Sequence, residues 1–139
     1  MIIADTNVVS EFMRDAPDPG VLAWARTLAP TDLTICVVTV EEIERGLGLL
    51  PEGRRRRDLE ARWRDLVDAF ADAVVVYDLP AARETAAILV TAQAAGRPMS
   101  LADAQIAGIC MAGGNELATR NVDDFSPVSG LALINPFDQ

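Results

Sequence analysis

Acidic and amide side chains stand at four places in this chain where together they could hold a hard divalent cation. They are Asp5, Glu42, Asp103, and the group Asn121, Asp123 and Asp124. Magnesium prefers oxygen ligands and takes a few of them from carboxylates and the rest from water or phosphate. One or two such ions can activate a water molecule and stabilise an in-line displacement at a phosphodiester. The chemistry that these residues favour is therefore metal-assisted hydrolysis.

The composition excludes most other reaction chemistries. The 139 residues include no histidine and no lysine, and all twelve basic residues are arginine. Without histidine there are no Ser-His or Cys-His nucleophile pairs and no histidine metal sites. Without lysine there is no Walker-type phosphate loop and no Schiff-base chemistry. A haloacid-dehalogenase-type phosphatase and a receiver domain would each lack the lysine that they require. The two cysteines, Cys36 and Cys110, lie in apolar segments and are expected to be buried and free.

The charge distribution bears on the kind of partner. A net charge of −9 opposes general affinity for nucleic acid, because nonspecific binding depends on the neutralisation of phosphates, and it favours a basic partner. One dense basic segment, Arg54–Arg57 followed by Arg62 and Arg64, alternates with acids opposite an apolar helical stripe. We interpret it as a solvated helix face with i,i+4 ion pairs such as Arg54 with Asp58. Contact with RNA is the alternative.

The hydropathy pattern predicts short apolar strands that alternate with helices. Strands are expected at 2–5, 34–38, 74–77, 116–119 and 131–134, and helices at 7–13, 21–28, 39–50, 52–71, 80–95 and 100–112. On the longest helix one face carries the apolar residues Leu59, Trp63, Leu66, Val67 and Phe70. Alternation of this kind predicts an α/β fold with a central, mainly parallel sheet of about five strands. The length is that of one domain, spanning 1–139.

The predicted sheet places the acids at one edge. Ligand sites in parallel sheets lie beyond the carboxyl ends of the strands. Asp5 ends the first predicted strand, Glu42 follows the second, and the segment 121–124 follows the fourth. Asp103 joins them if its own helix starts at the same edge. The sequence therefore predicts one acidic site at this edge of the sheet.

Each acid also has a purely structural interpretation. Thr39 and Glu42 have the spacing of a capping box, in which two side chains satisfy the first amides of a helix, and Ser100 and Asp103 share that spacing. Asp5 ends a buried strand, where a charge is unfavourable unless it is paired, and a helix that starts directly after it could supply amides. Converging carboxylates would repel one another, and a bound cation removes that penalty.

Five segments carry a pattern that extends over the whole chain. They are Ile2–Glu11, Thr39–Gly46, Ser100–Ala107, Leu117–Phe125 and Asn135–Phe137. In this order they resemble PIN-domain VapC toxins, in particular the FitB-like branch. The resemblance implies a three-layer α/β/α fold and an endoribonuclease that depends on Mg²⁺ or Mn²⁺. Such an enzyme would be the toxin of a toxin–antitoxin pair and would cleave cellular tRNA, rRNA or mRNA.

The resemblance also assigns site residues by position. The family's acidic triad falls on Asp5, Glu42 and Asp103. Asn121 stands where some relatives have a fourth acid, so Asp124 is expected to replace it, with Asp123 as the alternative. The residues expected to line the site and to orient water or phosphate are Thr6, Asn7, Thr119 and Asn121.

The same resemblance implies a homodimer that a cognate antitoxin neutralises. An arginine side chain offers a fork of donors that suits carboxylates, so we expect the antitoxin to insert an arginine among the acids. A groove between the helices predicted at 7–13 and 39–71 would take its apolar part. No apolar run reaches the roughly 20 residues of a membrane span, and Asp5 interrupts the place of a signal peptide, so a cytoplasmic location is expected. The rival interpretation is a non-catalytic binding module whose acids are helix caps.

Overall fold

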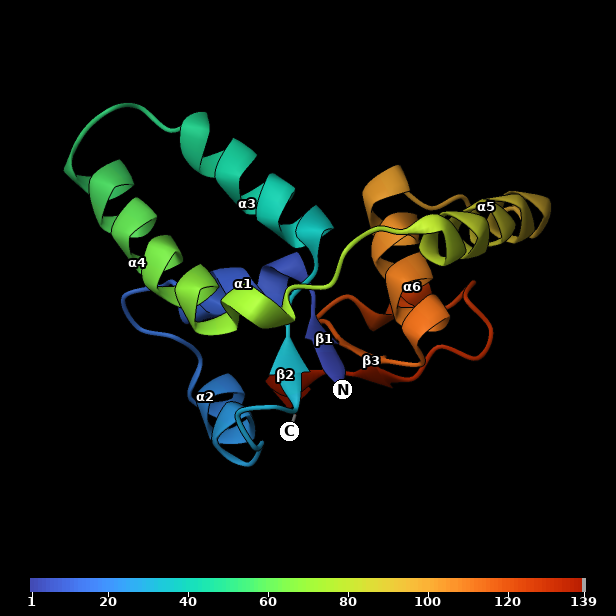
Figure 1. The fold of residues 1–139 in the computed structure, drawn as a ribbon, viewed down its shortest axis with the longest axis horizontal. Coiled ribbons are helices and arrows are strands. Elements are labelled where there is room, and N and C mark those ends of the chain that lie inside the picture. Colours follow the sequence, from blue (N-terminus) through green and yellow to red (C-terminus); the bar gives the residue numbers. More distant parts are fainter. Residues whose placement is uncertain (139) are drawn as a thin grey trace.

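A parallel sheet with helices on both faces organises residues 1–138, the part of the chain that the computed structural model describes (Figure 1). Its strands are β1 (Ile2–Ala4), β2 (Leu33–Thr34), β3 (Glu116–Ala118) and β4 (Leu133–Ile134), in the order β2-β1-β3-β4. All neighbouring pairs are parallel. The helices are α1 (Thr6–Phe12), α2 (Pro19–Arg26), α3 (Val37–Gly48), α4 (Arg54–Phe70), α5 (Leu79–Ala94) and α6 (Leu101–Gly113). Short 3-10 turns are η1 (Ala71–Ala73), η2 (Val122–Phe125) and η3 (Pro136–Asp138).

Alternation along the strands separates two helical layers. Ile3 and Leu117 belong to a buried cluster with residues of α5 and α6. Ile2, Ala4 and Ala118 belong to a second cluster with residues of α1 to α4. Successive side chains of a strand face opposite sides of the sheet, which assigns each layer its own core. Figure 1 shows α5 and α6 on one side of the sheet and α1 to α4 on the other, so the predicted three-layer α/β/α arrangement is confirmed.

The strand predicted at 74–77 does not form. Val75 makes an isolated parallel bridge with Cys36. The Val75 amide donates to the Ile35 carbonyl at 3.0 Å, and the Val75 carbonyl accepts from the Val37 amide at 2.9 Å. Val37 already belongs to α3, so the segment that follows Cys36 is helical and not extended. Residues 76 and 77 therefore have no strand to pair with. The sheet in the described residues therefore has four strands and not about five.

The strand predicted at 34–38 is shorter than expected. β2 ends at Thr34, and Val37 and Val38 form the first turn of α3, with Cys36 as its N-cap. β-branched residues favour strands, but burial in the tertiary structure overrides such preferences. Val38 is 9% exposed and packs in the core shared with α5 and α6. A helix therefore starts inside the apolar run that predicted a strand.

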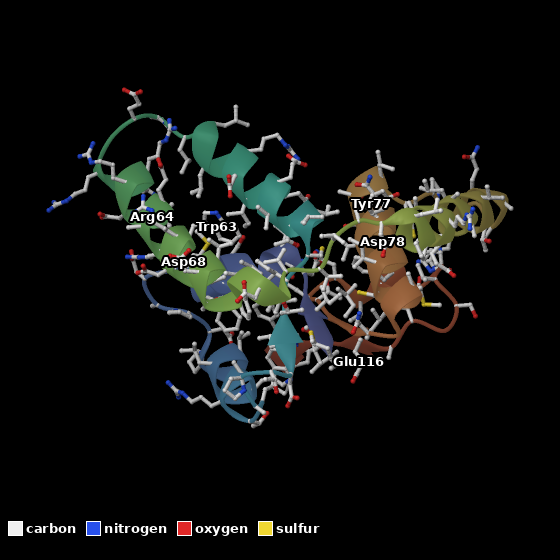
Figure 2. All side chains as sticks on the ribbon, viewed as in Figure 1. Trp63, Arg64, Asp68, Tyr77, Asp78 and Glu116 are labelled. Atoms are coloured by element: carbon white, nitrogen blue, oxygen red, sulfur yellow. The ribbon has the colours of Figure 1, made fainter. Side chains whose placement is uncertain are left out.

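The apolar stripe predicted on the longest helix is confirmed in α4. Trp63 is 5% exposed and lies in the same core as Ile2. Its indole N–H donates to Glu44 Oε2 of α3 at 3.2 Å, and Figure 2 shows Trp63 between the two helices. The charged face pairs differently from the prediction. Arg56 pairs with Glu60 at 2.7 Å, and Arg62 reaches across to Asp15 beyond the end of α1.

Close packing of α6 on α5 sets the position of the helix that carries Asp103. A Cβ atom at Gly108 would lie 2.1 Å from Thr85 Oγ1 and 2.8 Å from the Ala81 carbonyl oxygen. Any side chain at this position would push the two helices apart. Although α6 is strongly apolar, no helix in residues 1–138 has both the length and the hydropathy to cross a membrane.

Replacement of Gly108 by alanine should destabilise the protein, because the new methyl group overlaps the Thr85 side chain. Overpacking of this kind costs about 1–3 kcal/mol. Gly46→Ala is the matched control, since nothing lies within 4 Å of a Cβ added there in α3. Removal of that mid-helix glycine should stabilise the protein by roughly 0.5–1 kcal/mol. Urea unfolding measures both changes, and equal stability of the two variants would contradict the close packing of α5 on α6.

Candidate active site

Asp5 directly follows β1 and is held by three hydrogen bonds. Its carboxylate accepts from the Thr6 backbone amide at 2.7 Å, the Asn7 side-chain amide at 3.2 Å and the Thr119 hydroxyl at 2.8 Å. Asp5 is thus the N-cap of α1, and its link to Thr119 joins the ends of β1 and β3. Burial raises the pKa of Asp5, and the hydrogen bonds from Thr119 and Thr6 oppose that shift. The charges of nearby carboxylates raise the pKa further.

Glu42 lies on α3 and is tied to the start of α1. Its carboxylate accepts a hydrogen bond from the Thr6 hydroxyl at 2.7 Å. The predicted capping box of Thr39 and Glu42 is wrong, because α3 begins at Val37 and not after Thr39. Thr39 is instead buried inside the helix. Glu42 therefore faces Asp5, whose pKa its charge helps to raise.

Asp103 stands in the first turn of α6. The Ser100 hydroxyl accepts a hydrogen bond from the Asp103 amide at 3.2 Å, which confirms Ser100 as the helix cap. Burial is the largest cause that raises the pKa of the Asp103 carboxylate, and the Ser100 hydroxyl opposes it. The negative charges of Asp124 and Glu42 raise the pKa further. Acids from three separate segments are therefore within electrostatic reach of one another.

One hollow of about 520 Å³ at the carboxyl edge of the sheet gathers the predicted acids. Its lining includes Asp5, Glu42, Asp103 and Asp124. Thr6, Asn7 and Asn121 line it too, whereas Thr119 is fully buried behind Asp5. Asp123 borders a neighbouring hollow instead. Of the two adjacent aspartates, Asp124 is therefore the one that the fold turns toward the other acids. We call this hollow the acidic pocket.

Hydrogen bonds connect the strand ends behind the acidic pocket. The Thr119 hydroxyl accepts from the Asn121 amide at 3.1 Å while it donates to Asp5. The Asn7 side-chain carbonyl accepts from the Arg120 amide at 3.2 Å. Asn7 and Thr119 therefore each bind Asp5 and also the loop that follows β3. Three of the residues expected to line the site, Thr6, Asn7 and Thr119, thus hydrogen-bond its acids.

Residues that the sequence analysis did not assign also border the acidic pocket. They are Ser10, Glu11, Arg14, Arg120 and Phe125. Glu11 is only 4% exposed, and it accepts hydrogen bonds from the Asp18 amide at 2.8 Å and from Arg14 at 3.2 Å. The burial of Glu11 could have been predicted from the sequence, because it follows Val8 by three residues on the buried face of α1. Its contacts hold the chain between α1 and α2.

The donor set suits a hydrated hard cation. No three acidic, histidine or cysteine side chains of residues 1–138 are already gathered into a metal-binding cluster. Mg²⁺ does not require one, because it binds through one or two protein carboxylates and keeps several waters. The ion pairs within residues 1–138 involve other carboxylates: Glu11, Glu41, Glu60 and Asp15. Within the described chain, the predicted acids of the acidic pocket, Asp5, Glu42, Asp103 and Asp124, therefore have no ion-pair partner.

Comparison with known proteins identifies the fold. A model of the PIN-domain family matches residues 2–131. The chain belongs to the PIN-domain family. It is 36% identical over 139 residues to VapC ribonuclease Y4jK of Sinorhizobium fredii, and 32% identical over 138 residues to toxin FitB of Neisseria gonorrhoeae; each match covers 99% of both proteins. The crystal structure of FitAcB from Neisseria gonorrhoeae aligns with a TM-score of 0.91 at 31% identity and covers 100% of both chains.

These matches confirm the resemblance drawn from the sequence motifs. The PIN domain shares its fold over its full length with FitAcB, and its relatives include both a VapC ribonuclease and FitB. The five motif segments are spread over that length, so the resemblance does not rest on one local match.

Neutralisation of Asp103 should stabilise the metal-free PIN domain. Its pKa is raised in the folded state, above all by burial, so folding disfavours the ionised form. When the pKa of an acid is raised in the folded state, the folded protein loses stability as the pH rises through that pKa. Asp103→Asn removes this loss. We expect a higher melting temperature than wild type in EDTA at neutral pH, with the difference shrinking as the pH falls and Asp103 takes up its proton.

Asp5→Asn is the contrasting variant and should lower the melting temperature. The Asp5 carboxylate accepts three hydrogen bonds. An asparagine side chain has only one accepting oxygen, so its NH₂ group would face at least one of these three donors. A buried donor left without an acceptor costs about 1–3 kcal/mol, and we expect this cost to exceed the charge repulsion that the substitution relieves. Scanning calorimetry of both variants in EDTA tests the pair. Destabilisation by Asp103→Asn would show that this carboxylate acts mainly in the helix start.

Proposed function

We propose that this PIN domain is a metal-dependent endoribonuclease, the toxin of a type II toxin–antitoxin pair that cleaves cellular tRNA, rRNA or mRNA. The observation that carries the proposal is the convergence of Asp5, Glu42, Asp103 and Asp124 on one pocket. Relatives named VapC ribonuclease and toxin FitB support both the nuclease and the toxin assignment. A non-catalytic binding module is the alternative that the cleavage experiment below tests.

The chain's own residues would divide the work at a phosphodiester. A Mg²⁺ or Mn²⁺ ion held by Asp5, Glu42, Asp103 and Asp124 would supply charge stabilisation and a more acidic water. Asp5 is fixed in orientation by its three donors, so it suits a permanent ligand. Glu42 is aligned by Thr6 alone. Asp103 is half-buried, and the charges of Asp124 and Glu42 help to raise its pKa, so a cation held here would relieve that repulsion.

The fourth acid is proposed to be Asp124. It lines the acidic pocket and helps to raise the pKa of Asp103, whereas Asp123 borders a separate hollow. Both residues belong to the turn η2, so they differ in the direction of their side chains and not in local backbone structure.

Purified antitoxin-free protein should cleave total RNA with Mn²⁺ and should not cleave it in EDTA. We expect Asp5→Asn and Asp103→Asn to abolish cleavage, Glu42→Gln to reduce it, and Asp124→Asn to reduce it more than Asp123→Asn. Glu41→Gln is the matched control for Glu42, since Glu41 is exposed and pairs with Arg45 at 2.6 Å. Initial rates from preparations of equal concentration, each folded at the assay temperature, provide the comparison. Equal cleavage by wild type and Asp5→Asn, or no cleavage at any metal concentration, would refute the nuclease.

An antitoxin with a basic tail is the proposed partner. Beside the acidic pocket lies a second hollow of about 570 Å³ between α1, α3 and α4, which we call the helix groove. Both hollows share Thr6, Ser10, Arg14 and Glu42. The groove offers the apolar side chains of Met13, Ile43, Leu47 and Leu59. An antitoxin segment with apolar residues in this groove could place an arginine among the acids.

Antitoxin binding should compete with metal. Replacement of the inserted arginine by alanine should weaken neutralisation, and the unmodified antitoxin should weaken Mn²⁺ binding as measured by titration calorimetry. Leu59→Ala should weaken antitoxin binding and leave metal affinity unchanged, because Leu59 borders the groove but not the acidic pocket. An antitoxin that binds with undiminished affinity when Mn²⁺ saturates the protein would overturn this mechanism and leave the nuclease assignment intact.

The proposed toxin would act as a homodimer, as the family resemblance implied, and we propose the cytoplasm as its location. The exposed apolar side chains Leu79, Val90 and Leu101, on α5 and at the start of α6, are candidates for its interface.

A further inference from the structure

The hydroxyl of Thr39 is buried and takes no part in the cap that the sequence predicted. Thr39 is 0% exposed and is the third residue of α3. A threonine inside a helix can donate to the carbonyl four residues earlier, as Thr85 does to Ala81 at 2.8 Å. For Thr39 that carbonyl belongs to Ile35, which precedes α3 and accepts from the Val75 amide at 3.0 Å instead. The Thr39 hydroxyl is therefore available to another side chain.

That side chain is Thr6, whose hydroxyl holds Glu42. The hydroxyl oxygens of Thr6 and Thr39 are 3.3 Å apart, and the Thr6 hydroxyl lies 2.7 Å from Glu42 Oε1. A hydroxyl group has only one proton to donate. The bond to Glu42 is shorter and its acceptor is a carboxylate, so it is the stronger of the two. The Thr6 proton therefore points to Glu42, and the Thr39 hydroxyl donates to the Thr6 oxygen.

These groups form a chain of hydrogen bonds that ends at the Glu42 carboxylate. The Cys36 sulfur lies 3.9 Å from the Thr39 hydroxyl oxygen, within the distance of a weak hydrogen bond to sulfur. The Thr39 hydroxyl follows, and the Thr6 hydroxyl is the last group before Glu42. Neighbouring bonds in such a chain polarise and strengthen one another. Without the Thr39 donor, the Thr6 hydroxyl could rotate about its C–O bond, and its proton would no longer be directed to Glu42.

We propose, on the basis of the metal binding in the proposed function, that Thr39 is a positioning residue for Glu42 and acts through Thr6. The Thr39 hydroxyl fixes the direction of the Thr6 proton, and that proton holds the Glu42 carboxylate at the acidic pocket. Glu42 depends on this support more than Asp5 does. Within residues 1–138 the Glu42 carboxylate accepts one hydrogen bond, whereas the Asp5 carboxylate accepts three.

A purely structural hydroxyl between α1 and α3 is the alternative interpretation, and Thr85 provides the control for it. Thr85 is also buried, but its hydroxyl bonds the backbone carbonyls of Ala81 and Ala104 in the layer of α5 and α6. It does not border the acidic pocket. Thr85→Val therefore removes a buried hydroxyl, as Thr39→Val does, without a change near the acids.

The test measures Mn²⁺ affinity by titration calorimetry for Thr39→Val, Thr39→Ser and Thr85→Val in the full chain. Thr39→Val replaces the hydroxyl by a methyl group and should weaken Mn²⁺ binding about tenfold, a typical loss when a residue that orients a metal ligand is replaced. Thr39→Ser keeps the hydroxyl and should bind Mn²⁺ as tightly as wild type, and so should Thr85→Val. Melting curves in EDTA establish that each variant is folded. Thr39→Ala takes the place of Thr39→Val if the valine variant is not.

A double-mutant cycle with Glu42→Gln tests the route of the effect. In that background Asp5, Asp103 and Asp124 remain to hold the cation, but the carboxylate that Thr39 is proposed to position is gone. Thr39→Val should therefore add no further loss of Mn²⁺ affinity to that of Glu42→Gln, because residues that act as one unit are not additive. A hydroxyl that acts independently of Glu42 would add its full loss.

The outcomes separate this inference from the proposed function. If Thr39→Val binds Mn²⁺ as tightly as Thr85→Val, if Thr39→Ser is as weak as Thr39→Val, or if the losses add in the cycle, the positioning role is wrong and the nuclease stands. If wild type binds Mn²⁺ but cleaves no RNA, the proposed function fails, and the affinities of the variants still decide the role of Thr39. If wild type binds no Mn²⁺, both proposals fail.

Discussion

The Asp5 carboxylate is buried between the ends of two parallel strands, and a buried charge persists only where hydrogen bonds replace the lost water. The start of α1 provides two of these donors and Thr119 after β3 provides the third. The turn into α1 and the parallel register of β1 with β3 bring these donors to the carboxylate. The same bonds leave the carboxylate at the floor of the acidic pocket.

Around that fixed acid the fold collects others that repel it. Glu42 and Asp103 both raise the pKa of Asp5, and Asp124 raises the pKa of Asp103. Such a cluster lowers the stability of the folded chain in the ionised state, and it therefore favours any cation that enters. A metal ion and an arginine side chain meet the same need. The proposed competition between metal and antitoxin rests on this shared chemistry.

The sequence by itself determined the features that depend on local spacing: alternating strands and helices, the Ser100 cap, the apolar face of α4 and the position of Asp5 at a strand end. Tertiary structure decided what depends on distant partners. α3 begins within the valine run, where Val38 is buried in the core shared with α5 and α6. The 74–77 strand does not form because the segment that it would pair with has already entered α3. Glu42 bonds Thr6, and Asp124 rather than Asp123 turns into the acidic pocket. Helical and strand periods are properties of neighbouring residues, whereas the orientation of each acid depends on hydrogen bonds between residues as much as 114 positions apart, which only the packed sheet brings together.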